Sequence, residues 1–102
     1  MRRDVFQAIA DPTRRRIIDM LAKGPLTLNG VASNFEMARP SVSKHVRILR
    51  ECGLISVKRQ GRERYCTARL RGLREVAQWA NYYRVFWDKK LGALKRFVEE
   101  NP

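Results

Sequence analysis

The chain has 102 residues, 44% of them apolar, which suits one small domain with a packed core and excludes a disordered chain. Its 22 Lys and Arg against 10 Asp and Glu give a formal net charge of +12, so we expect a polyanionic partner, with nucleic acid first. No apolar run is long enough to span a membrane, and the residues after Arg2 and Arg3 do not form the apolar segment of a signal peptide. We therefore expect a cytoplasmic protein without a membrane partner.

Short breaker segments divide the first half of the chain into four predicted helices, at residues 3–10, 12–22, 28–34 and 39–52. Asp11 is placed to cap the second helix, with Pro12 at its first position. Thr27 is placed to cap the third helix and Gly53 to end the fourth. Ala38, which precedes the fourth helix, has no side chain that can cap it.

The second half reads as two strands, at residues 54–59 and 63–70, and one long helix at residues 73–100. Gln60, Gly61 and Arg62 form the turn between the strands. The long helix carries a near-heptad apolar stripe that the rest of a small domain cannot cover. A partner helix from a second subunit explains this stripe better than an ordinary core helix does. The residues expected in such an interface are Val5, Phe6, Val76, Ala80, Tyr83, Trp87, Leu91 and Leu94.

Four helices, a hairpin and a final helix make up the α-α-α-α-β-β-α order of a winged helix-turn-helix, a mainly α fold with a β-hairpin wing. We expect a single domain over residues 1–102 that forms a homodimer through its terminal helices. The helix-turn-helix occupies about residues 27–52, the wing about 54–70 and the dimerisation helix about 73–100.

The predicted fourth helix has two distinct faces. Val42, Val46 and Leu49 share one face and are expected to pack inward. The outward set combines short hydroxyls with long cations and has no acid, as a helix entering the major groove of DNA requires. Its members are Arg39, Ser41, Ser43, Lys44, Arg47 and Arg50. The wing tip adds Arg59, Arg62 and Arg64, which would enter a minor groove or lie along phosphates.

Three segments resemble the ArsR (arsenical-resistance-repressor) family. Residues 8–21 look like its second-helix signature, residues 41–55 like its recognition helix and first strand, and residues 61–65 like its wing. The resemblance implies a homodimer that binds an imperfect palindromic operator in double-stranded DNA and represses transcription until a signal releases it. By position, the base-contacting residues of the family correspond to Arg39, Pro40, Ser41, Ser43, Lys44 and His45.

The signals that release other members have no clear counterpart here. Residues 26–32 lack the cysteine pair of metal sensors, and residues 73–100 contain no histidine, so we expect no metal site and no cofactor. Two alternatives for an effector stay open. One is a redox switch at Cys52 and Cys66. The other is a small apolar ligand between subunits, among the aromatic residues Trp79, Tyr82, Tyr83, Phe86 and Trp87.

Three other classes of protein fit the sequence less well. No nucleophile–base pair, paired carboxylates or Gly-rich phosphate loop is evident, so we do not expect an enzyme. The charge at the hairpin tip argues against a pure protein-interaction module. A non-specific architectural DNA-binding protein is the main alternative to a sequence-specific repressor, because it would share the basic charge.

Overall fold

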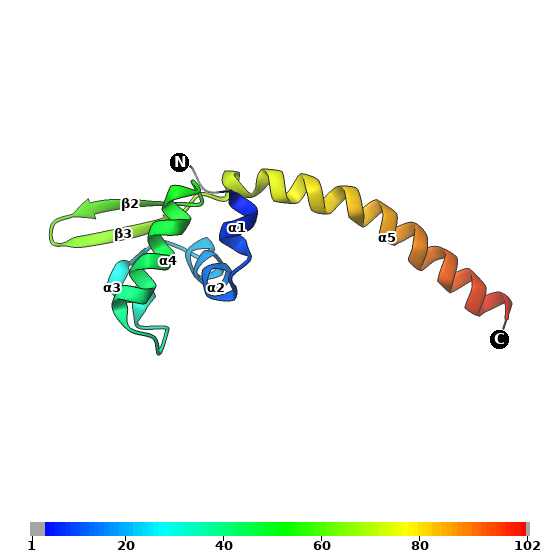
Figure 1. Ribbon diagram of the computed structural model, residues 1–102, viewed down its shortest axis with the longest axis horizontal. Helices are drawn as coiled ribbons and strands as arrows, with labels where there is room; N and C mark the ends of the chain where they lie inside the picture. Colours follow the sequence, from blue (N-terminus) through cyan, green and yellow to red (C-terminus); the bar gives the residue numbers. More distant parts are fainter. Residues whose placement is uncertain (1–3, 102) are drawn as a thin grey trace.

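The computed structural model describes residues 4–101. Figure 1 shows a compact part made of helices and a hairpin, from which the last helix projects. The elements in chain order are α1 (Val5–Ile9), α2 (Pro12–Ala22), β1 (Leu26–Thr27), α3 (Leu28–Ala32), α4 (Arg39–Glu51), β2 (Ile55–Gln60), β3 (Glu63–Ala68), the 3-10 helix η1 (Leu70–Leu73) and α5 (Arg74–Glu100). The expected mainly helical fold with a hairpin wing is confirmed. The predicted start of the first helix at Arg3 lies outside the described residues.

The predicted helix caps are confirmed. The Asp11 carboxylate accepts hydrogen bonds from the backbone N–H groups of Thr13 and Arg14, at 2.8 and 3.1 Å, and Pro12 opens α2. The Thr27 hydroxyl accepts from the N–H of Gly30 at 2.9 Å. The helix that follows Thr27 ends at Ala32, two residues earlier than expected.

The wing belongs to a three-stranded antiparallel sheet with the order β1-β3-β2. Gln60 pairs with Glu63, so the turn consists of Gly61 and Arg62. Gly61, the first residue of the turn, has a φ of 62°. Only glycines have a positive φ in the described chain, so the φ of Arg62 is negative. A positive φ followed by a negative φ fits a type II′ turn. Leu70 does not continue the second wing strand as predicted, because it begins η1.

Strand β1 was not expected. Its two residues pair with β3, Leu26 opposite Cys66 and Thr27 opposite Tyr65. A two-residue strand is too short to show the alternation by which strands are recognised in a sequence. The pairing joins the base of the wing directly to the start of α3.

The core lies among α1–α4 and the base of the sheet. The buried apolar residues of the described chain are Ala8, Ile17, Ile18, Leu21, Val31, Val42, Val46, Ile48, Leu49, Cys52, Leu54, Ile55 and Cys66. They include the inward positions predicted for α4. They include no residue of α5, so the core forms without the long helix.

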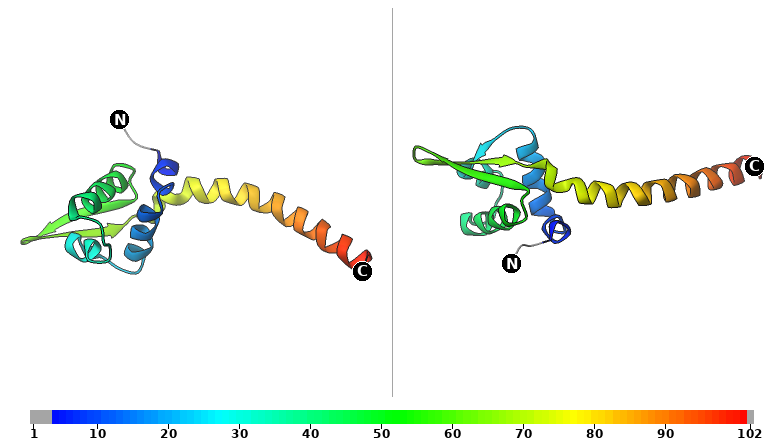
Figure 2. Two further views of the ribbon diagram at one scale, coloured as in Figure 1. Left: turned by 60° about the horizontal axis from the view of Figure 1, so that its bottom comes forward. Right: turned by 90° about the horizontal axis from the view of Figure 1, so that it is seen from above.

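Helix α5 extends away from this core (Figure 2). The molecule measures 65 × 30 × 22 Å as a result. Helix α1 touches the beginning of α5, where the rings of Phe6 and Trp79 lie 5.7 Å apart edge to face. Beyond this point large apolar side chains are exposed, Trp87 at 58% and Leu94 at 58% among them. No helix within the described residues is both long and apolar enough to cross a membrane.

Candidate nucleic-acid interface

Helix α4 presents its polar side next to the wing because its apolar side is held in the core. Val42, Val46 and Leu49 are buried, and Ile48 is buried as well. No side chain caps the start of α4 at Ala38, as the sequence indicated. The helix ends at Glu51, and Gly53 follows it with a left-handed φ of 77°.

Two adjoining hollows lie between α4 and the wing, and together we call them the α4–wing groove. The first is lined by Leu28, Pro40, Ser43, Lys44, Val46, Arg47, Arg50, Val57, Arg64 and Cys66. The second is lined by Leu28, Asn29, Arg39, Ser43, Arg59, Arg62, Glu63 and Arg64. Leu28, Ser43 and Arg64 line both hollows, so the groove is continuous. Seven of its side chains are cationic (Arg39, Lys44, Arg47, Arg50, Arg59, Arg62 and Arg64), and one, Glu63, is acidic.

Two of these cations face each other across the wing. Arg59 and Arg64 are direct partners in the antiparallel register of β2 and β3. They lie on the same face of the hairpin as the pair Val57 and Cys66, which packs toward α4, because side chains alternate between faces. Like charges directly opposite each other destabilise a sheet. An anion bound between them would remove that repulsion, so the pair favours a polyanionic ligand.

The groove brings together nine of the eleven residues that the sequence placed toward DNA. They are Arg39, Pro40, Ser43, Lys44, Arg47, Arg50, Arg59, Arg62 and Arg64. Ser41 is exposed but lies about 160° around the helix from Ser43, away from the wing side. His45 also lies outside the groove lining and is directed at α2. The groove adds Asn29, which sequence reasoning did not select because one polar residue in a short helix forms no pattern.

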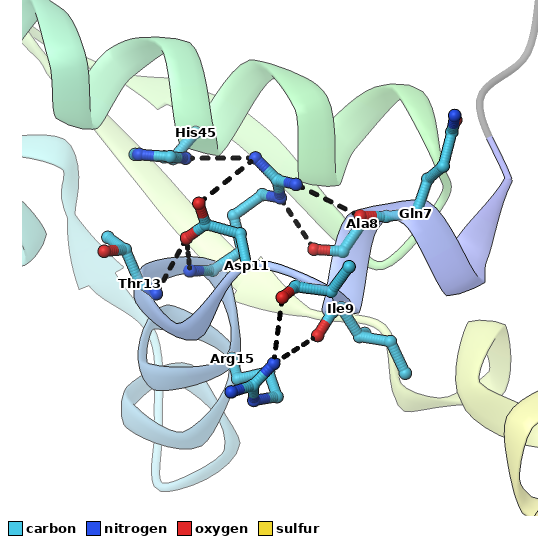
Figure 3. Close-up of polar contacts among 9 residues, drawn as sticks. Gln7, Ala8, Ile9, Asp11, Thr13, Arg15 and His45 are labelled. Carbon is cyan, nitrogen blue, oxygen red and sulfur yellow. Dashed lines mark hydrogen bonds and ion pairs between the residues drawn. The ribbon is translucent and has the colours of Figure 1, made fainter.

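His45 meets a guanidinium that joins three helices (Figure 3). Arg14 donates from Nε to the carbonyl oxygen of Ala8 at 2.6 Å and from Nη2 to that of Gln7 at 3.1 Å. Its Nη1 lies 3.3 Å from Nδ1 of His45 and 4.0 Å from Oδ2 of Asp11. A guanidinium only donates, so in the neutral form of the ring Nδ1 of His45 is the acceptor of this contact. Arg14 thus connects the end of α1, the start of α2 and the middle of α4.

The Asp11 carboxylate is stabilised in its charged form at this corner. Partial burial acts to raise the pKa of Asp11, but the hydrogen bonds from the backbone N–H groups of Arg14 and Thr13 and the nearby guanidinium of Arg14 outweigh it. The net effect is a pKa below the ordinary value of an aspartate. Asp11 therefore stays ionised at the start of α2, where the helix dipole also favours negative charge.

Neither sulfur is accessible at the surface of the described chain. Cys52 and Cys66 are both fully buried, and burial raises the pKa of the Cys66 thiol. This environment disfavours the redox switch considered from the sequence. Within residues 4–101, no group of three or more His, Cys, Asp or Glu side chains is placed to hold a metal ion.

Comparison with known proteins gives consistent matches. Residues 11–57 match the family described as "Bacterial regulatory protein, arsR family". The transcriptional repressor SdpR of Bacillus subtilis (strain 168) is 38% identical over 76 residues, which cover 74% of this chain and 84% of SdpR. The HTH-type transcriptional regulator Rv2034 of Mycobacterium tuberculosis (strain ATCC 25618 / H37Rv) is 39% identical over 59 residues, 58% of this chain and 55% of that relative.

Solved structures show the same fold over most of the chain. A crystal structure of an ArsR family transcriptional regulator superimposes with a TM-score of 0.74 at 38% identity, covering 83% of this chain and 88% of the other. An ArsR-like transcriptional regulator from Rhodococcus sp. RHA1 gives a TM-score of 0.73 at 28% identity, covering 97% of this chain and 91% of the other. The likeness thus extends from the helix-turn-helix into α5.

Proposed function

Because the chain belongs to the arsR family of bacterial regulatory proteins, we propose that it binds an imperfect palindromic DNA operator as a homodimer and represses transcription there. Membership of this family makes the chain a transcriptional regulator with a winged helix-turn-helix, not an enzyme. The proposal adds the form of the operator, the dimeric state and the residues that contact DNA.

The observation that carries the proposal is the α4–wing groove, where seven cationic side chains from α4 and the wing line one continuous surface. A major groove about 12 Å wide admits a helix such as α4, whose Ser43 and Lys44 would then reach base edges. The wing, with Arg59 and Arg64 opposed, would lie against the sugar-phosphate backbone next to that groove. Arg62, at the two-residue turn, would extend furthest along the DNA.

The exposed apolar face of α5 supports the dimer. The core is complete without α5, yet Tyr83, Trp87, Leu91 and Leu94 remain 45–58% exposed along one side of it. A soluble protein rarely leaves an apolar surface of this length uncovered. Val5 and Phe6 of α1 are half-buried beside the first turns of α5, so they would join the same interface. A second copy of α5 would cover this face and hold two copies of α4 at a fixed distance.

Selection of duplexes from a random pool tests the proposal. We expect the selected sites to contain two related half-sites in inverted orientation. In competition with random duplex, binding should favour such a site by at least ~10³-fold at physiological salt. Equal affinity for both duplexes would contradict the proposal and indicate a non-specific architectural protein.

A further inference from the structure

The junction between α4 and α5 is unusually close. Helix α5 leaves the compact part at the end where α4 finishes (Figure 1). The N–H of Arg69 donates to the carbonyl oxygen of Leu54 at 2.7 Å, which fastens the chain before η1 to the turn after α4. Three residues later, a Cβ added at Gly72 would lie 2.6 Å from Cδ2 of Leu54 and 3.0 Å from the carbonyl oxygen of Gly53. Only a residue without a side chain allows this approach.

The two groups that face Gly72 have little room to move away. Leu54 is 1% exposed and belongs to the core. Gly53 has a left-handed φ of 77°, and its N–H donates to the carbonyl oxygen of Arg50 at 3.0 Å, so it is part of the end of α4 itself. A larger residue at position 72 would therefore displace η1, and with it the start of α5.

We infer that Gly72 is a positioning residue that sets the spacing between the two DNA half-sites, by fixing how α5 leaves the end of α4. This inference rests on the proposed function, in which α5 joins two copies of the chain. The 27 residues of α5 make a helix of about 40 Å. A small change of direction at its first turn would therefore move α4 of one copy a larger distance relative to α4 of the other. Recognition helices of a dimer must reach major grooves one helical turn apart, about 34–36 Å.

The chain provides a matched control on the same helix. A Cβ at Gly92 would meet no atom within 4 Å in the described part of the chain. Gly92→Ala therefore adds the same methyl group to α5 without touching α4, and the helical propensity of alanine makes it neutral or stabilising.

The experiment measures affinity for a series of duplexes that carry the two selected half-sites, with their centre-to-centre spacing changed one base pair at a time. A duplex with one half-site serves as the reference. Wild type and Gly92→Ala should share one preferred spacing. Gly72→Ala should lower the ratio of affinity at that spacing to affinity at the neighbouring spacings at least fivefold, with half-site affinity within twofold of wild type. Gly72→Val should have a larger effect.

A role in stability alone would lower affinity for all duplexes equally and leave this ratio unchanged, which would overturn the inference. Leu54→Val trims the side chain nearest to position 72, so the double variant with Gly72→Ala should recover part of the wild-type spacing preference. If Gly72→Ala does not fold, Leu54→Val alone loosens the junction and should reduce the preference, and an unchanged preference would overturn the inference. A wild-type profile without any preferred spacing would overturn the palindromic dimer as well as this inference.

Discussion

Nη1 of Arg14, on α2, lies 3.3 Å from Nδ1 of His45, on the recognition helix. The same guanidinium holds the carbonyl oxygens of Ala8 and Gln7 at the end of α1. Because α1 also contacts α5 through Phe6, this hydrogen-bonded corner connects α4, which would read DNA, with the helices that would form the dimer. His45 thus has a structural partner within the chain, in addition to any contact with DNA.

We expect Arg14→Ala to weaken operator binding about tenfold or more, because α4 loses a fastening to α2. Each lost hydrogen bond should also lower the free energy of unfolding by about 1 kcal/mol. Arg15→Ala is the matched control, since Arg15 donates to the carbonyl oxygens of Ile9 and Ala10 in the same corner. Fluorescence anisotropy with the selected operator measures the difference. Equal losses of affinity in both variants would contradict a specific role for Arg14.

Arg64→Ala should weaken DNA binding and reduce the slope of log affinity against log salt by about 1, because one phosphate contact is lost. The same change should leave the melting temperature unchanged or slightly higher, since it removes the repulsion between Arg64 and Arg59. Lys95→Ala is the control. Lys95 is 77% exposed on α5 and its ion pair with Glu99 is exposed too, so both quantities should stay as in wild type. A large loss of stability in Arg64→Ala would argue that the arginine serves the fold.

Trp87→Arg should convert the dimer into a monomer, because it places a charge in the apolar face of α5. Val85→Arg introduces the same charge two residues away, about 160° around the helix, and should remain dimeric. Sedimentation at micromolar concentration distinguishes the two states. Wild-type protein that sediments as a monomer would defeat the proposed dimer.

Asp11→Ala should lower the free energy of unfolding by about 1 kcal/mol at pH 7, the usual effect of losing an N-cap. The pKa of Asp11 is lowered in the folded state, so its contribution is present above the unfolded pKa, about 3.9, and is lost as the pH falls through the folded value. The difference between wild type and Asp11→Ala should therefore shrink in acid. Asp11→Asn keeps a capping oxygen and should remove most of this pH dependence. Chemical denaturation between pH 2.5 and pH 7 provides the comparison, and a constant difference would contradict the assigned cause.

Local signals in the sequence predicted the element order well. Asp11 with Pro12 marked the start of α2, and Gly61 marked the wing turn, because each of these effects is decided by neighbouring residues. The spacing of Val42, Val46 and Leu49 likewise separated the two faces of α4. These local patterns are sufficient to assign the groove cations to a helix and a hairpin.

Features that depend on distant segments were not predicted. The approach of Arg14 to His45 joins residues 31 positions apart, and nothing in either local pattern indicates the pairing. Gly72 lies between the predicted second wing strand and the predicted long helix, and no local pattern marks it, although in the structure it permits a close contact with Gly53 and Leu54. Both cases are decided by tertiary packing, which local propensity does not contain.

The two-residue strand β1 has a consequence for the thermodynamics of binding. Pairing of Leu26 with Cys66 ties α3 to the wing, so the helix-turn-helix and the hairpin lack an independent hinge at that point. Little internal entropy would then be lost on binding of DNA in the groove, which would favour affinity through preorganisation. An effector that releases the DNA would therefore have little effect by loosening the helix-turn-helix and wing of one copy. Its binding free energy would act more effectively on the relative orientation of the two copies, through the α5 helices that would join them.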